Sequence, residues 1–62
     1  MNNFSIEIGF FMEQANYHAD CMEGADLDDF LLHEKLMVQA IEDLKRLGVI
    51  YDPITGKKTK LP

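Results

Sequence analysis

The stretch DLDDFLLHEKLMVQAIEDLKRLG, residues 26–48, decides the fold because it carries every signal of one complete helix. Asp26 occupies the N-cap position, acids follow in the first turn at 28–29, and bases fill the last turn at 45–46, as the helix dipole favours. Gly48 then supplies the left-handed residue that commonly ends a helix. The pattern therefore predicts a helix over 27–47.

Two apolar stripes run along this predicted helix. The broad stripe holds Leu27, Phe30, Leu31, Met37, Val38, Ile41 and Leu44, and the second holds Leu32, Leu36, Ala40 and Leu47. Glu34 falls inside the broad stripe, which has two interpretations. Its carboxylate lies at the edge of the stripe or pairs with a base, or it is a buried polar group that sets the register of the helices or holds a metal. Glu42 and Arg46 are spaced for an i,i+4 ion pair.

Residues 4–22 carry a second helical pattern. One face gathers Phe4, Ile8, Phe11, Met12, Ala15, Ala19 and Met22, and a narrower stripe gathers Ile6, Phe10, Tyr17 and Cys21. The alternation over 4–10 also suits a strand, but the seam continues well beyond residue 10, which favours a helix. The short link at 23–26 contains Gly24, so an antiparallel helix hairpin is the expected geometry.

After Gly48 the period changes to that of a β-hairpin over 49–61. Val49-Ile50-Tyr51 is β-branched and aromatic, and the segment 52–56 places Pro and Gly where a tight turn needs them. An isolated hairpin is marginal in water, so we expect it to pack on the helices, to pair with another copy or to order on a partner. Its Ile50, Ile54 and Leu61 need burial and could cover at most one secondary stripe. The predicted fold class is mainly α, a two-helix hairpin plus a C-terminal β-hairpin, completed as a helical bundle by homo-oligomerisation.

Length and charge indicate the stability, the charge distribution and the cellular compartment of this chain, which is predicted to be a single domain. A 62-residue chain buries only about 60% of its unfolded surface and needs extra stabilisation, yet a lone Cys21 excludes an intramolecular disulfide. Residues 1–44 sum to −9 and residues 45–62 to +4, so an acidic body carries a basic tail. The sequence contains no secretion signal and no membrane-spanning run, which predicts a cytoplasmic protein without a membrane partner.

No catalytic or cofactor motif is present, so we expect neither an enzyme nor a bound cofactor. Nucleophilic catalysis by Cys21 or Ser5 would need a base and an oriented third group. His18 is in reach of Cys21 along the helix, but the neighbouring Asp20 and Glu23 would raise the pKa of the thiol. One alternative is a metal site, because a hairpin hinged near Gly24 brings His33 and Glu34 near the level of His18 and Cys21, and zinc accepts such ligands. The acidic run from Asp20 to Asp29 fails the calcium-loop pattern.

A second alternative is nucleic-acid binding through the tail, where Lys57, Lys58 and Lys60 cluster. Phosphate recognition needs Lys or Arg arrayed on one surface, and the first helix has none, so nucleic acid is not the expected partner. Lysines on a hairpin edge also discourage strand aggregation.

Partner binding is the preferred hypothesis, because each helix shows two apolar stripes and a partner helix covers only one. We expect a small acidic regulator, adaptor or inhibitor that pairs with itself and with another protein, whose surface is basic where it meets the acidic run. Chains of this kind are typical of accessory proteins of phages or mobile elements. The predicted partner-binding residues are Ile6, Phe10, Tyr17, Asp26, Asp28, Asp29, Leu32, Leu36 and Ala40.

Overall fold

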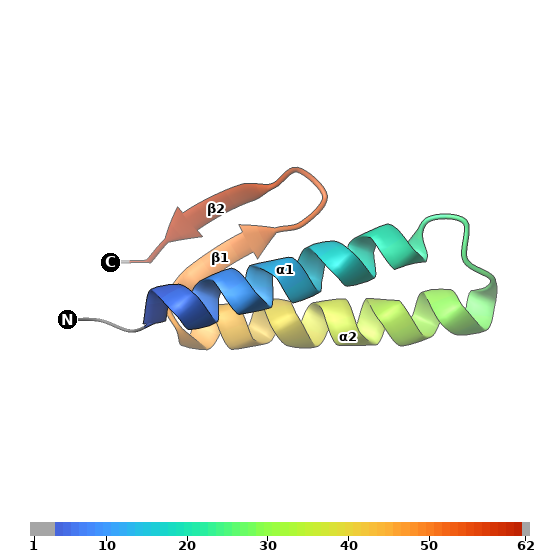
Figure 1. Cartoon of the computed structure of the whole chain (residues 1–62), viewed down its shortest axis with the longest axis horizontal. Coiled ribbons are helices and arrows are strands. Elements are labelled where there is room, and N and C mark those ends of the chain that lie inside the picture. The colour runs from blue at the N-terminus through green and yellow to red at the C-terminus, as the bar shows by residue number, and fades with distance from the viewer. Residues whose placement is uncertain (1–3, 62) are drawn as a thin grey trace.

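The computed structural model of the chain describes residues 4–61. Two helices, α1 (Phe4–Met22) and α2 (Leu27–Arg46), lie side by side as an antiparallel hairpin, and the strands β1 (Val49–Asp52) and β2 (Lys57–Lys60) follow (Figure 1). The predicted order of a helix hairpin and a β-hairpin is confirmed. The chain is mainly helical, with one two-stranded antiparallel sheet.

Both ends of α2 are closed by the residues that the sequence indicated. The Asp29 backbone N–H donates to Asp26 Oδ1 at 3.0 Å, which caps the first turn. At the other end Gly48 has φ +83°, and its N–H donates to the Lys45 carbonyl at 3.0 Å. Leu47 is the C-cap, so the helix stops one residue before the predicted end.

The predicted Glu42–Arg46 ion pair is wrong. Arg46 Nη1 instead lies 2.8 Å from Asp43 Oδ1, and Lys45 Nζ lies 3.8 Å from Glu42 Oε2. Residues three and four apart are both neighbours on a helix, and each base pairs with the carboxylate three residues before it.

The β-hairpin is closed by the predicted turn. Val49 pairs with Lys60 and Asp52 with Lys57, and the Gly56 N–H donates to the Asp52 carbonyl at 2.8 Å. Asp52 Oδ1 also accepts from the Ile54 N–H at 2.9 Å. Gly56 adopts φ +76°, a backbone conformation that favours glycine.

A small core forms where β1 crosses the two helices. Its buried members come from α1, α2 and β1, and half-buried side chains of both helices pack around them. The Tyr51 hydroxyl donates to Asn16 Oδ1 at 2.7 Å, which ties β1 to α1 across 35 positions of sequence. The buried residues are Ala15, Ala40, Leu44, Val49 and Tyr51.

The strand β1 presents the opposite set of side chains from the one expected. Val49 and Tyr51 are buried, whereas Ile50, Ile54 and Leu61 are all exposed, Ile54 by 77%. Side chains alternate along a strand, and the path of the chain after Gly48 turns the odd positions toward the helices. Of the alternatives that the sequence left open, coverage of the chain's own helices by these three residues is therefore not what the structure shows.

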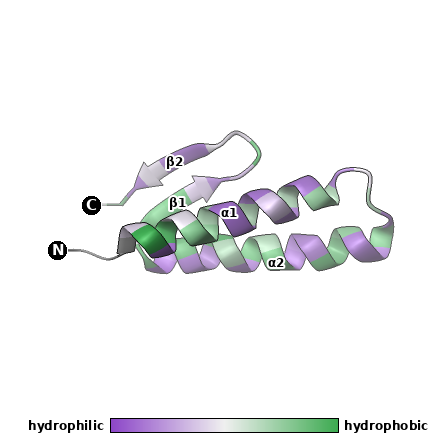
Figure 2. Cartoon of the chain, viewed as in Figure 1, coloured by the Kyte–Doolittle hydropathy of each residue, from purple (hydrophilic) through white to green (hydrophobic). Residues whose placement is uncertain are grey.

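Large apolar side chains remain exposed on both helices outside this core. Figure 2 shows that hydrophobic segments, coloured green, recur along α1 and α2. The exposed residues include Phe10 and Tyr17 on α1, and Leu31 and Leu36 on α2. Within residues 4–61, neither helix is long and apolar enough to cross a membrane.

Candidate partner-binding surface

A shallow groove of about 180 Å³ runs between α1 and α2 on the side away from the β-hairpin. On α1, Met12 and Asn16 lie on the side that faces the β-hairpin, and Gln14 lies in the groove. Residues two apart on a helix point in nearly opposite directions, so the groove is on the side opposite the β-hairpin. We call this side of the molecule the groove face. Its described lining residues are Phe10, Phe11, Gln14, His18, Leu36, Gln39, Ala40 and Asp43.

The groove brings together three of the predicted contact residues from two helices. Phe10 and Leu36 stand at its sides, 54% and 40% exposed, and Ala40 forms a buried floor between them. Ile6 and Leu32 are also exposed and lie one helical turn before Phe10 and Leu36 respectively. The second stripes of the two helices, separate in sequence, therefore meet on one face.

Two histidines face each other beside this groove. His18 Nδ1 lies 2.8 Å from His33 Nδ1, and the Tyr17 ring, 60% exposed, stands edge-on with its centroid 6.3 Å from that of His33. A hydrogen bond between two imidazoles needs one donor and one acceptor, so at least one ring must be neutral. Burial, and then the charge on His33, lower the pKa of His18 below its ordinary value.

A second polar contact on α1 links Tyr17 with the half-buried Cys21 one turn later. The neighbouring Cys21 raises the pKa of Tyr17 above its ordinary value, first through a hydrogen bond and then through charge.

Of the four candidate metal ligands, the structure brings only His18 and His33 into direct contact. Glu34 and Cys21 are half-buried on their own helices. Within residues 4–61, no group of three or more His, Cys, Asp or Glu side chains is placed to hold a metal ion. The sequence placed the two histidines at one level, but their hydrogen bond depends on how closely the helices approach.

The acidic residues Asp26, Asp28 and Asp29 are exposed at the hairpin end of the helices. Asp26 also serves as the cap of α2, so part of its carboxylate is already used. The three residues lie off the groove itself and form a separate charged surface at the end of the rod.

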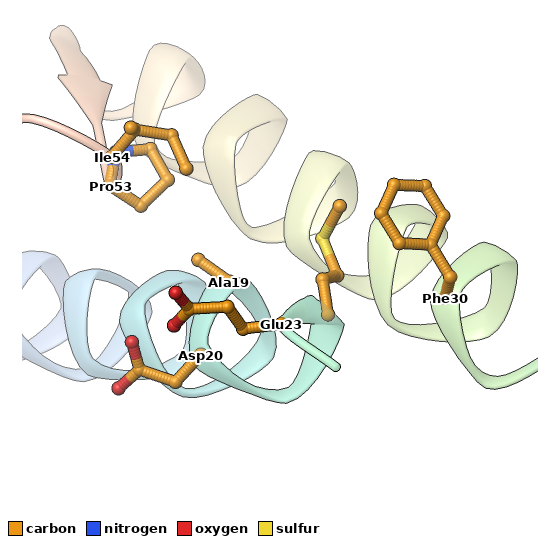
Figure 3. A pocket seen from close by; sticks show the side chains of 7 residues that line it. Ala19, Asp20, Glu23, Phe30, Pro53 and Ile54 are labelled. Carbon is orange, nitrogen blue, oxygen red and sulfur yellow. The ribbon is translucent and has the colours of Figure 1, made fainter. Parts of the chain in front are cut away.

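A larger pocket of about 420 Å³, which the sequence did not suggest, opens between the β-turn and the ends of the helices (Figure 3). Pro53 and Ile54 form one wall, Phe30 stands at the far side, and the carboxylates of Asp20 and Glu23 lie at the rim. It exists because the turn folds over the end of α1, and the only signal for that was apolar Ile54 in a turn. Ala19 and Met22 complete the described lining.

The three tail lysines divide between the two faces of the sheet. Lys58 and Lys60 pair with Tyr51 and Val49, and directly opposed residues project from the same face, so both lysines lie on the helix side. There they line a pocket of about 320 Å³ beside α1. Lys57, paired with Asp52, projects from the other face, so the lysines do not form the single basic surface that phosphate binding favours.

No protein-family model, curated protein or solved structure matches the chain. A function is therefore inferred from the side chains and surfaces described above.

Proposed function

We propose that the protein is a small non-catalytic protein–protein interaction module that acts as a homo-oligomer, in the manner of a regulator, adaptor or inhibitor. The observation that carries the proposal is the exposure of Phe10, Tyr17 and Leu36 on the groove face after the β-hairpin has covered the other side. Contiguous apolar surface with a polar rim is typical of interaction sites, and aromatic anchors dominate their affinity.

The chemistry of the groove supports a binding role over a catalytic one. Its volume of about 180 Å³ is below the roughly 300 Å³ at which small-molecule pockets begin. Its two titratable groups are already engaged: Asp43 pairs with Arg46 at 2.8 Å, and His18 Nδ1 bonds to His33. A catalytic site needs a nucleophile and a free base within hydrogen-bond reach.

The exposed acids at the end of the rod favour a partner that is basic beside its apolar contact. Asp28 and Asp29 lie in the first turn of α2, about two turns before Leu36. Charges at the rim of an interface steer association and select against acidic partners more than they add affinity.

Mass measurement with one pair of matched variants tests the proposal. We expect light scattering to give a mass above the 7.1 kDa of one chain, because the groove face is covered by self-association. Leu36→Glu should lower that mass while circular dichroism keeps its helical signal, because a charge then faces an apolar contact. Val38→Glu is the control, since Val38 is 47% exposed on another side of α2 and should leave the mass unchanged.

Two outcomes would contradict the proposal. One is a monodisperse 7.1 kDa particle that remains folded on dilution, which would leave the apolar face without a partner of its own kind. The other is an equal loss of mass in Leu36→Glu and Val38→Glu, which would mean that the groove face has no special role.

A further inference from the structure

We infer that the groove face is covered by a second copy of this chain lying antiparallel to the first, with the two-fold axis passing close to Leu36. The inference rests on the proposed function and adds the orientation of the second copy and the position of the two-fold axis. Three features of the groove face carry it: its shape, its position along the helices and the charges at its ends.

The shape of the groove face is self-complementary. It has a hollow with the small, buried Ala40 as its floor, and beside the hollow it has the exposed rings of Phe10 and Tyr17. The groove has a volume of about 180 Å³, and a protein cavity of about 150 Å³ accepts a benzene ring, so the groove has room for the Tyr17 ring of a second copy. Because His18 lies level with His33, Tyr17 lies close to the level of Leu36, and an axis at that point brings it beside the hollow of the other copy. In a two-fold dimer both copies use the same surface, so a ring of each copy can enter the hollow of the other, and the same contact forms twice.

The position of the groove favours full overlap of the two copies. Leu36 and Ala40 lie at the middle of α2, which spans Leu27–Arg46. A two-fold axis at this point lets both helices of each copy lie along the partner for their whole length. An axis near either end would leave half of the exposed apolar residues uncovered.

The charges of α2 select the antiparallel orientation. Its first turn holds Asp28 and Asp29, and its last turn holds Lys45 and Arg46. Arg46 follows Leu36 by ten positions and Asp26 precedes it by ten, so an axis at Leu36 sets the acidic end of one copy beside the basic end of the other. A parallel pair would set like charges and like ends of the helix dipoles together.

The edge of the sheet is a poor competing surface for self-association. On β2, Lys58 and Lys60 project from the same face as the buried Val49 and Tyr51. Inward-pointing charges on an edge strand oppose the addition of another strand, because they would be desolvated against it. Association through the helices is therefore favoured over association through the strands.

Cysteine crosslinking tests both the surface and the orientation. In a Cys21→Ser background, Leu36→Cys and Ile6→Cys are prepared separately and oxidised, and each is checked for helical content. Both positions are exposed, so the fold should tolerate them. In the antiparallel dimer Leu36→Cys forms a covalent dimer and Ile6→Cys does not, because the two copies of residue 6 then lie at opposite ends.

A second readout removes the dependence on disulfide geometry, which requires Cα atoms within about 7 Å. Spin labels on the same two cysteines should give a short distance between the copies at position 36 and a much longer one at position 6. A short distance at both positions means a parallel dimer, which overturns the orientation and leaves the proposed function standing. A long distance at position 36 in an associated particle overturns the choice of surface, and a 7.1 kDa particle overturns both proposals.

Discussion

Tyr51 is the residue that joins the two hairpins of the fold. Its ring is buried in the core and its hydroxyl donates to Asn16 Oδ1 at 2.7 Å, so one side chain contributes both packing and a directional bond. Asn16 is itself exposed, and water can replace the lost donor if the hydroxyl is removed.

The first prediction concerns this hydrogen bond. Tyr51→Phe should lower the free energy of unfolding by about 1 kcal/mol, because the ring remains packed and only a partly exposed bond is lost. Urea denaturation of the two proteins measures the difference. Thr59→Val on β2 is the control, since it removes an exposed hydroxyl and should change stability by less than about 0.5 kcal/mol. An equal decrease in the free energy of unfolding in the two variants would mean that the Tyr51–Asn16 hydrogen bond makes no specific contribution to stability.

The second prediction concerns His18, whose pKa is lowered in the folded chain, first by burial and then by the charge on His33. Below about pH 6.5, the ordinary histidine value, the unfolded chain binds a proton that the folded chain resists. The stability that this group contributes is therefore complete above that pH and is lost as the pH falls toward the lowered pKa.

Denaturation between neutral pH and mildly acidic pH, above the range where carboxylates titrate, should show this loss. His18→Gln should give a shallower dependence, because one of the two facing imidazoles is gone. A free energy of unfolding that stays level or rises as the pH falls would show that the pair carries no such coupling.

The element whose behaviour follows most directly from its own residues is α2. Its cap, its first-turn acids, its last-turn bases and the glycine after it all lie within residues 26–48, and the structure uses each of them. Local signals of this kind depend on neighbours three or four residues away, which is why the bounds of this helix could be predicted to within one residue.

The third prediction separates the hydrogen bond of the cap from its charge. Asp26→Ala should lower the free energy of unfolding by about 1 kcal/mol, because the Asp29 N–H loses its acceptor. Asp28→Ala is the matched control: it removes a charge near the helix dipole and should cost less, roughly 0.3–1 kcal/mol, and screening by salt should reduce that cost. Urea denaturation at low and high salt measures both. If the loss from Asp26→Ala also disappeared at high salt, the cap would act only through its charge.

At the scale of the whole molecule, the chain exposes more surface than its size requires. Its accessible surface is 4675 Å², against about 4,100 Å² for a compact protein of 7.1 kDa. Two antiparallel helices with a short sheet on one side make an elongated body, and among the residues whose burial the structure describes only five are buried. A core of this size gives a marginally stable fold, so covering the groove face would add a large fraction of the total stability.

The fourth prediction follows from that balance. If association stabilises the fold, the Tm should fall as the protein is diluted, because mass action then shifts the population toward separate chains. Leu36→Glu should have a lower Tm that no longer depends on concentration, and Val38→Glu should keep the dependence. Thermal melts followed by circular dichroism over a dilution series provide the test. A wild-type Tm that is independent of concentration would contradict the role of association in stability.

The candidate surface could be predicted only in part. Phe10, Tyr17, Leu32 and Leu36 were predicted because helical periodicity groups them into a second apolar stripe on each helix, and the structure then shows them to be exposed. Ala40 belonged to the same stripe but lies on the floor of the groove, since burial depends on how closely α1 approaches. The His18–His33 hydrogen bond and the pocket beneath Ile54 have the same origin in contacts between distant segments.

By itself the sequence determined the local structure of this protein: where each helix begins and ends, where the turn lies, and that each helix carries two apolar stripes. These features follow from capping, periodicity and glycine conformation, which act over a few residues. Only the tertiary structure decided that Val49 and Tyr51, and not Ile50, face the helices, and which stripes stay exposed. A strand alternates with period two, so a small rotation of the chain after Gly48 exchanges its buried and exposed sides, and only packing against α1 and α2 selects between them.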